Sequence, residues 1–368
     1  MQRIVRVTPP SPPAPPPAEP IARQLELSLS EFQEITGIDN TNTIELFDAL
    51  PLYQQQAYSV PTDAPRVERL EFRKRTITTT VKPAGIIVDD KMRYTFAGTR
   101  EQLVEHTLRK MLSEPGDHVR FIQDTNGMVI PTLMITPYML RKRLIEIGHG
   151  FKIAEIRQAL DILGNTKFIV TINSGGEVVD LESEKAIIGR SHRTPRSDES
   201  GERSREQITL HPLVLKSIVE RSYRQLNWRK FTSIKRPGAR WLYARLIHHF
   251  TGADRQGGMF SRPYNIDLET ILASSGMRRY VSRAGVPLVK DNVRQVRLDL
   301  AELSEKGILD SLRPYNERLR KARDVGKTRG PARVVGAVWE LFLGSDTAEE
   351  IVRTNVKMKT ANASIERE

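Results

Sequence analysis

The sequence contains no cysteine in its 368 residues, which excludes both a disulfide framework and a thiolate metal site. It also contains no apolar run of the length that a transmembrane helix needs. Residues 1–7 carry two arginines but lead into prolines instead of an apolar signal segment. We therefore expect a cytoplasmic protein that makes no contact with a membrane.

Signatures of catalysis and of cofactor binding are also absent. The seven histidines show neither His-x-His nor H-E-x-x-H spacing. The sequence has no Walker A loop, no G-x-G-x-x-G motif and no nucleophile elbow. It therefore predicts a binding protein and not an enzyme, with no cofactor and no bound metal.

Positive charge is in excess, and it is concentrated in one half of the chain. The 57 Lys and Arg and 45 Asp and Glu give a formal net charge of +12, and the isoelectric point is near 9.8. Residues 208–344 hold 26 basic and 12 acidic residues, a net of +14, which leaves −2 for the rest of the chain. Proteins that bind nucleic acid concentrate cations on the surface that faces phosphate. The distribution therefore indicates a polyanionic partner for the C-terminal half.

Two polar segments divide the chain. Residues 8–20, TPPSPPAPPPAEP, predict an extended, disordered arm because proline fixes φ and removes backbone donors. Residues 191–207 mix charge, Ser and Gly without an apolar repeat, which predicts a linker. The domains expected from these breaks are a proline-rich arm over 1–65, a first domain over 66–190, a linker over 191–207, a second domain over 208–344 and a tail over 345–368.

The first domain is predicted to begin with strands and then a helix. Strand-like segments lie between residues 66 and 96, where TITTTV and GIIV are rich in β-branched residues. Thr99 and Gln102 then form a capping box at the start of a helix. Asn126 and Gly127 predict the turn of a later hairpin.

A helix-turn-helix pattern with a following hairpin ends the first domain. Thr136 and Pro137 predict the N-cap and first position of a helix, and residues 148–150, GHG, end it. A second helix carries an apolar stripe of Ile153, Ile156, Leu160 and Leu163. The segments 167–172 and 177–181 then predict a hairpin. This is the order of a winged helix.

The same order recurs downstream. A helix opens at Pro237, Asp267 caps a short helix, and a third helix covers 290–306. The apolar stripe of this third helix lies 140 positions after the first stripe and consists of Val293, Val296, Leu300 and Leu303. A strand is predicted from Ile308. We therefore expect an α+β fold, mostly helical, with two tandem winged-helix domains; the alternative is an unrelated α+β pair.

The helix 290–306 is the predicted recognition helix. With its stripe buried, Asp291, Arg294, Gln295 and Leu298 face outward and Arg297 flanks them. Lys290, at the start of the helix, is also predicted to contact DNA. Arg and Gln suit readout of guanine and adenine edges in the major groove. We expect the outward Leu298 to pack against the first domain. The alternative for the whole face is an ordinary solvated helix surface.

Basic residues fill the predicted second wing, where only two acidic residues accompany eight cations. We expect the wing to bind phosphate with a strong salt dependence; the alternative is a basic loop without a partner. Its cations are Arg313, Arg318, Arg320, Lys321, Arg323, Lys327, Arg329 and Arg333.

A further basic group, Lys235, Arg236 and Arg240, lies around the start of the helix at Pro237. Cations at a helix N-terminus oppose the macrodipole, so the group indicates a neighbouring anion such as phosphate.

In the first domain the corresponding recognition helix carries Arg157 and Gln158. It also carries Glu155 and Asp161. We therefore expect this helix to bind DNA weakly or to form a protein interface.

The order of parts over residues 70–344 resembles the theta-type plasmid replication initiators of the TrfA and RepA-like group. The resemblance implies tandem winged helices that bind repeated origin sites, called iterons, in double-stranded DNA. It also implies origin melting, recruitment of the host initiator and replicative helicase, and a bacterial nucleoid- or plasmid-associated protein, and it leaves a monomer–dimer equilibrium open. The alternatives are a winged-helix transcriptional regulator and a rolling-circle nickase, for which paired metal-binding histidines are lacking.

Residues 24–29, QLELSL, resemble the hexapeptide by which bacterial proteins bind the polymerase sliding clamp. The resemblance assigns the clamp contacts to Gln24, Leu25, Leu27 and Leu29. A position just after the proline-rich arm is typical of an accessible linear peptide. The alternative is that these leucines begin a strand of the first domain.

Overall fold

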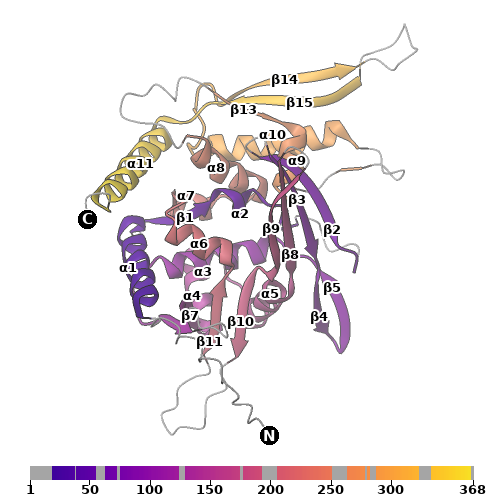
Figure 1. The fold of residues 1–368 in the computed structure, drawn as a ribbon. Coiled ribbons are helices and arrows are strands. Elements are labelled where there is room, and N and C mark those ends of the chain that lie inside the picture. The colour runs from indigo at the N-terminus through magenta and orange to yellow at the C-terminus, as the bar shows by residue number, and fades with distance from the viewer. Residues whose placement is uncertain are drawn as a thin grey trace, which may run out of the picture.

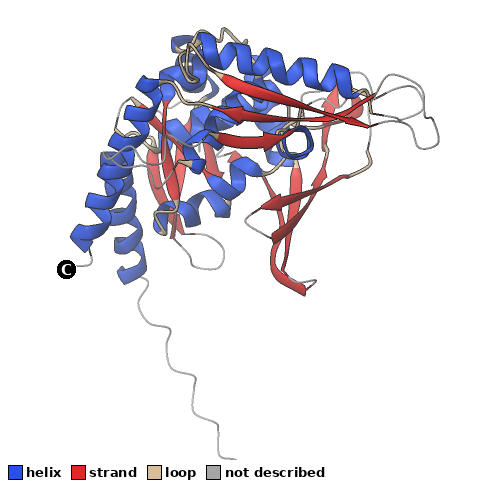
Figure 2. Cartoon of the chain, turned by 90° about the horizontal axis from the view of Figure 1, so that it is seen from above, coloured by secondary structure: helices blue, strands red, loops and turns tan. Residues whose placement is uncertain are grey.

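The structure is a computed structural model, and it describes residues 19–37, 39–54, 63–72, 75–123, 129–174, 177–192, 205–250, 263–277, 280–281, 287–322 and 333–365. Helices alternate with separate antiparallel sheets, which confirms the predicted α+β class. Figure 2 shows the strands in several small groups with helices between them. The buried apolar side chains form two clusters, and we call the parts built around them the first and the second unit.

The first unit contains six helices of the described chain. They are α1 (Glu19–Thr36), α2 (Glu45–Ala49), α3 (Thr99–Leu112), α4 (Pro137–Glu146), α5 (Ile153–Asn165) and α6 (Pro212–Val219). Its strands are β1 (Asn40–Ile44), β2 (Arg66–Phe72), β3 (Arg75–Lys82), β4 (Ala84–Val88), β5 (Lys91–Thr95), β6 (Val119–Gln123), β7 (Val129–Ile135), β8 (Lys167–Ser174), β9 (Glu177–Ala186), β10 (Ile188–His192) and β11 (Glu206–Leu210).

The sheets of the first unit have the orders β2-β3-β8-β9, β10-β11-β7-β6 and β4-β5. In β3 every second residue is buried, Ile77, Thr79 and Val81, as expected for a strand with one face on the core. The pairing of β8 with β9 confirms the predicted hairpin. The predicted turn at Asn126 and Gly127 lies outside the described residues, but the strands on either side of it, β6 and β7, do pair.

The second unit follows at β12 (Tyr223–Asn227), which pairs with β1 of the first unit. Its remaining elements are α7 (Trp228–Ser233), α8 (Pro237–His249), β13 (Tyr264–Asp267), α9 (Leu268–Ser274), α10 (Val289–Glu305), β14 (Tyr315–Ala322) and β15 (Arg333–Leu341). The strands β13, β14 and β15 form a sheet of order β13-β15-β14. Figure 1 shows α10 running along this sheet.

Most helix boundaries agree with the capping signals. Thr136 accepts a hydrogen bond from the Met139 N–H at 3.2 Å, and Asp267 accepts one from the Thr270 N–H at 2.8 Å. The capping box of α3 is displaced by one residue from the prediction. Its N-cap is Gly98, whose N–H donates to the Glu101 carboxylate at 2.8 Å. The strand predicted from Ile308 was also wrong, because β14 begins seven residues later, at Tyr315.

The two cores do not separate at the predicted linker. The two ends of the segment 191–207 belong to β10 and β11, which pair with each other, and β11 also pairs with β7. Apart from Met358 of the C-terminal helix, the first core extends to Tyr223, and the second begins at Leu226. The separation therefore lies within β12, about fifteen residues past the predicted start of the second domain at residue 208.

Residues 24–29 lie in α1, so neither the linear clamp-binding peptide nor the strand is found. The side chains of Gln24 and Leu25 lie outside the described residues. Leu27 is 64% exposed, whereas Leu29 is 4% exposed and belongs to the first core. A clamp-binding peptide must offer both leucines to its partner. The burial of Leu29 assigns this segment to the fold and corrects the prediction of a free arm up to residue 65.

A buried ion cluster joins the two units. Arg109 of α3 is fully buried and donates to both carboxylate oxygens of Asp48, at 2.7 and 3.0 Å, and also to Glu105. Asp48 accepts a further bond from the Thr43 hydroxyl at 2.6 Å, and this hydroxyl lies 3.1 Å from Nε2 of His248 on α8. Burial raises the pKa of Asp48, but the Arg109 guanidinium outweighs it and holds that pKa well below its ordinary value. The cluster therefore connects α3 to α8 through the Arg109–Asp48 ion pair and the Thr43 hydroxyl.

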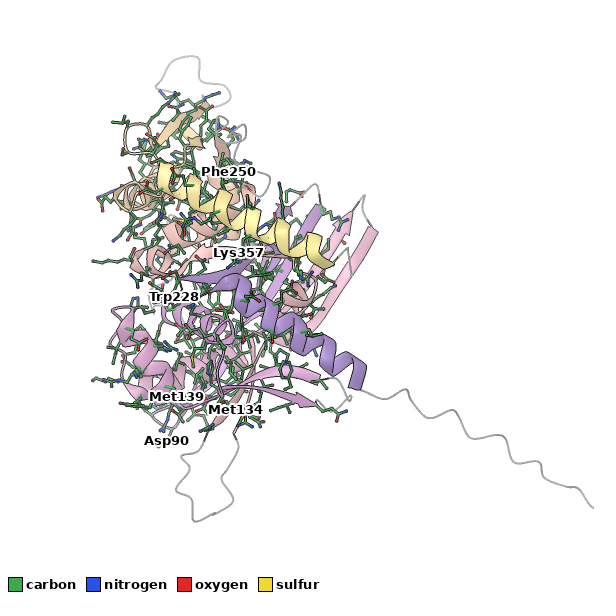
Figure 3. The ribbon with its side chains drawn as sticks, turned by 90° about the vertical axis from the view of Figure 1, so that its left-hand side faces the viewer. Asp90, Met134, Met139, Trp228, Phe250 and Lys357 are labelled. Atoms are coloured by element: carbon green, nitrogen blue, oxygen red, sulfur yellow. The ribbon has the colours of Figure 1, made fainter. Side chains whose placement is uncertain are left out.

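The C-terminal helix α11 (Ser345–Ile365) packs on both units. Ile351 lies in the second core and Met358 in the first. The Lys357 ammonium donates to the carbonyl oxygens of Glu34, at 3.1 Å, and Ile35, at 2.5 Å, which lie in the last turn of α1. Figure 3 shows α11 and α1 side by side, with Lys357 labelled. The predicted tail is thus part of the fold.

Leu29→Ala is expected to lower the free energy of unfolding by about 2 to 5 kcal/mol, because it removes a buried side chain from the first core. Leu27→Ala, on the exposed side of the same helix, is the matched control and should change stability by less than about 0.5 kcal/mol. Urea unfolding of both variants measures the difference. Equal stability of the two variants would show that α1 is not packed on the core.

His211 makes stability depend on pH. Its Nδ1 accepts a hydrogen bond from the Leu213 N–H at 3.2 Å at the start of α6. Burial, with Lys185 adding to it, lowers the pKa of His211 from 6.5 to about 3. The folded state therefore holds His211 neutral. The free energy of unfolding keeps its full value above the pKa of His211 in the unfolded state, and it decreases as pH falls below that pKa.

His211→Asn keeps a capping acceptor but removes the titration. Between pH 7 and pH 5 the wild type should lose about 2 kcal/mol more stability than the variant, at about 1.4 kcal/mol per pH unit below the unfolded pKa. Denaturant unfolding at both pH values gives the comparison. Parallel pH profiles of the two proteins would contradict the assignment.

Candidate nucleic-acid interface

The predicted recognition helix exists as α10, and its apolar stripe is buried. Val293, Val296, Leu300 and Leu303 are each at most 3% exposed. The main contacts of α10 are with α8, α9 and β15, all in the second unit. The opposite side of the helix is therefore left open.

Two carboxylates on α10 hold it against the start of α8. Glu302 accepts hydrogen bonds from the backbone N–H groups of Lys235, at 2.6 Å, and Arg236, at 2.9 Å. Asp299, which is 1% exposed, accepts a hydrogen bond from Nε of Arg236 at 2.5 Å. A Cβ on Gly238 would lie 2.2 Å from Oδ2 of Asp299, so any larger residue there would displace the Asp299 carboxylate. These contacts hold α10 against the start of α8, and we call this contact region the joint.

The electrostatics of this joint are dominated by burial. Desolvation raises the pKa of Asp299 to about 6, although the Arg236 guanidinium opposes the shift. Close to neutral pH Asp299 is thus still mostly ionised and paired.

The basic group at the start of α8 therefore has an anion beside it, but the anion belongs to the protein and is not phosphate. Arg236 forms an ion pair with Asp299. Arg240 is 1% exposed and donates to the carbonyl oxygens of Ile234 and Lys235, at 2.8 and 3.1 Å. Because Arg240 is buried, the prediction that it contacts DNA is corrected. Of the three predicted cations, Lys235 alone has an exposed side chain.

On the open side of α10 the predicted residues differ in whether they form ion pairs. Lys290 and Arg294 are exposed and form no ion pair with any residue that the structure describes. Arg297 instead donates to both carboxylate oxygens of Glu317 on β14, at 2.5 and 2.8 Å. Leu298 is 44% exposed, so the predicted packing against the first unit is not found.

The β14–β15 hairpin provides a second group of cations. Arg320 and Lys321 are exposed and have no acidic partner in the described ranges. Arg318 forms an ion pair with Glu340 of the neighbouring strand, and the Arg313 guanidinium lies 4.6 Å from the centre of the Phe342 ring. The other predicted wing residues, Arg323, Lys327 and Arg329, and the side chain of Arg333, lie outside the described residues.

The corresponding helix of the first unit, α5, is less open. It packs against β4 and β10. Arg157 is exposed and Gln158 half-buried, while Asp161 is paired with Arg190 of β10. Arg157 is thus the exposed cation of this helix, and its weak interaction with DNA stays a prediction.

The sequence contained a signal for Asp299 that the prediction missed. Asp299 lies three residues after Val296 and four before Leu303, so it falls on the apolar side of α10. A carboxylate in that position requires a cation from another element. The partner, Arg236, lies 63 positions earlier.

Comparisons with known proteins give no family. No family model and no curated protein matches the sequence. Among solved structures, the chain is similar to a selenomethionine derivative of domains 2 and 3 of RctB, with 12% identity, a TM-score of 0.39 and coverage of 81% of this chain and 97% of that chain. A second structure of RctB domains 2–3 aligns at 11% identity over 83% and 99% of the two chains, with a TM-score of 0.36. These scores are too low to carry an argument, and the resemblance to the TrfA and RepA-like group stays a prediction.

The described ranges contain no group of three or more side chains placed to hold a metal ion. No helix in them has the length and apolar character to cross a membrane.

Glu302→Ala should lower the free energy of unfolding by about 1 kcal/mol, because two N–H groups at the entrance of α8 lose their acceptor. Glu305→Ala, one turn further along α10 and exposed, serves as the control and should have little effect. Thermal unfolding of the two variants at neutral pH makes the comparison. If Glu305→Ala is as costly as Glu302→Ala, general charge and not the joint determines stability.

Proposed function

We propose that the protein binds double-stranded DNA through its second unit, with α10 in the major groove and the β14–β15 hairpin along the phosphate backbone. The succession α8, β13, α9, α10, β14, β15 supports this proposal, together with the sheet order β13-β15-β14. A winged helix has such an order of elements, and its last helix before the hairpin enters the groove.

The observation that carries the proposal is a set of four exposed cations on α10 and the hairpin that have no carboxylate partner in the described part of the chain. Lys290 and Arg294 stand on α10, and Arg320 and Lys321 stand on the hairpin beside it. Their basic neighbours Arg297 and Arg318 are neutralised by acidic side chains. A solvated surface has no need to keep unpaired cations together, whereas a surface that meets phosphate does.

The two groups of cations have different roles in this proposal. Arg294 lies on the outer side of α10, where a guanidinium can donate to O6 and N7 of guanine. Arg320 and Lys321 lie on a hairpin, where they contact phosphate oxygens and carry no sequence information. Specificity thus belongs to α10 and salt-dependent affinity to the hairpin.

The first unit contributes less to DNA binding in this proposal. Its α4, α5, β8 and β9 repeat the order of a winged helix, but the strands packed beside α5 leave Arg157 as the exposed cation of that helix. We propose that it makes a weaker, secondary contact.

We further propose that the bound DNA is a set of repeated origin sites and that the protein initiates plasmid replication, without catalytic activity of its own. The support is the tandem order of parts and their resemblance to theta-type initiators. Recruitment of the host initiator and replicative helicase belongs to the same proposal. Footprinting on the DNA that flanks its gene tests it: several direct repeats support initiation, whereas one palindrome supports a transcriptional regulator.

Arg294→Ala is expected to weaken binding to the selected site by about 1 to 3 kcal/mol and to leave binding to a random duplex almost unchanged. Arg320→Ala should weaken both, and should reduce the slope of log K against log salt by about 1. The site is first obtained by selection from a random library with the wild type. Fluorescence anisotropy over a range of salt concentrations then gives both quantities.

Arg120→Ala is the matched control, because Arg120 is an exposed arginine on β6 of the first unit. It should change neither affinity nor the salt slope. If all three variants lose affinity equally, the effect is one of net charge and the assigned interface is wrong.

A further inference from the structure

The amide of Gln295 is held by a side chain from outside α10. Nη2 of Arg236 lies 2.9 Å from Oε1 of Gln295. A guanidinium has N–H donors and no acceptor, so the amide atom that faces it must be the oxygen. The amide nitrogen therefore points away from Arg236 with its two N–H groups, and it forms no hydrogen bond within the described residues.

Arg236 has little freedom to release this contact. Its backbone N–H is bound by Glu302, and its Nε donates to Asp299 inside the joint between α8 and α10. Asp299 and Gln295 lie one turn apart on α10, so a single guanidinium spans both. Because Asp299 is buried, it holds the guanidinium in place while the outer side of Gln295 stays accessible.

We propose that Arg236 is a positioning residue that makes Gln295 a donor-only reader of base edges, so that α10 selects guanine at the position that Gln295 contacts. The inference rests on the proposed function, in which α10 enters the major groove. A free glutamine reads adenine, because its oxygen accepts from N6 and its nitrogen donates to N7. With the oxygen held by Arg236, the outward group offers only donors. Guanine presents two acceptors, N7 and O6, in the major groove.

Gln295→Glu tests the orientation without disturbing the joint. One carboxylate oxygen keeps the bond from Arg236, and the other replaces the amide nitrogen with an acceptor. The preferred base should change from guanine to cytosine, whose N4 amino group is a donor, by roughly 10-fold in relative affinity. The measurement is library selection followed by sequencing, with affinity for a random duplex as the reference.

Arg236→Met removes the donors and keeps the apolar stem. It frees the amide of Gln295, so the preference at the same position should move from guanine towards adenine by roughly 10-fold. The variant also leaves Asp299 without its cation, so Arg236→Met/Asp299→Asn is measured beside it, and unfolding curves show which of the two is folded. A purely structural role of Arg236 would lower all affinities and leave the base preference unchanged.

The outcomes separate this inference from the proposed function. If the wild type binds no duplex DNA, the proposed function itself fails. If it binds and selects bases, but neither substitution changes the preference at any position, then Arg236 does not orient Gln295 and the inference is overturned. A wild-type preference for adenine at the position that responds to Gln295→Glu would also overturn it.

Discussion

The fully buried guanidinium of Arg109 is the constraint on which the arrangement of the two units depends. A buried charge of this kind is tolerated only with ionised partners and satisfied hydrogen bonds, and Asp48 and Glu105 provide them. Because Asp48 also binds Thr43, which reaches α8 through His248, the charge fixes the position of the helix that supports α10. The proposed DNA-binding surface thus depends on an interaction in the first unit.

Pairing of cations with carboxylates also shapes the candidate DNA-binding surface of the second unit. Asp299 and Glu302 bring acidic groups to the entrance of α8, where the basic residues of the sequence predict a bound phosphate. On the outer sides of α10 and of the hairpin, Lys290, Arg294, Arg320 and Lys321 keep no acidic partner in the described ranges. The fold therefore uses its acidic residues to decide which of its many basic residues are available to a polyanion.

Features that depend on nearby residues were predictable, and features that depend on distant partners were not. The stripe of α10, with Val296 and Leu300 buried, follows from local periodicity, as do the caps at Thr136 and Asp267. The pairing of β11 with β7 joins segments about seventy residues apart, so a polar stretch beside β11 looked like a linker. In the candidate site, single residues such as Arg294 could be proposed from spacing, but the contact of Arg236 with α10 needed the tertiary structure.

The position of α11 has a consequence for the order in which the protein acquires its structure. Met358 fills part of the first core, and Lys357 binds the end of α1. During synthesis the first unit leaves the ribosome long before these residues do. Its core stays incomplete, without Met358, until α11 has been translated. Because Ile351 of the same helix belongs to the second core, both units complete their cores only with α11, and the N-terminal half, which is synthesised first, is exposed to aggregation for longest.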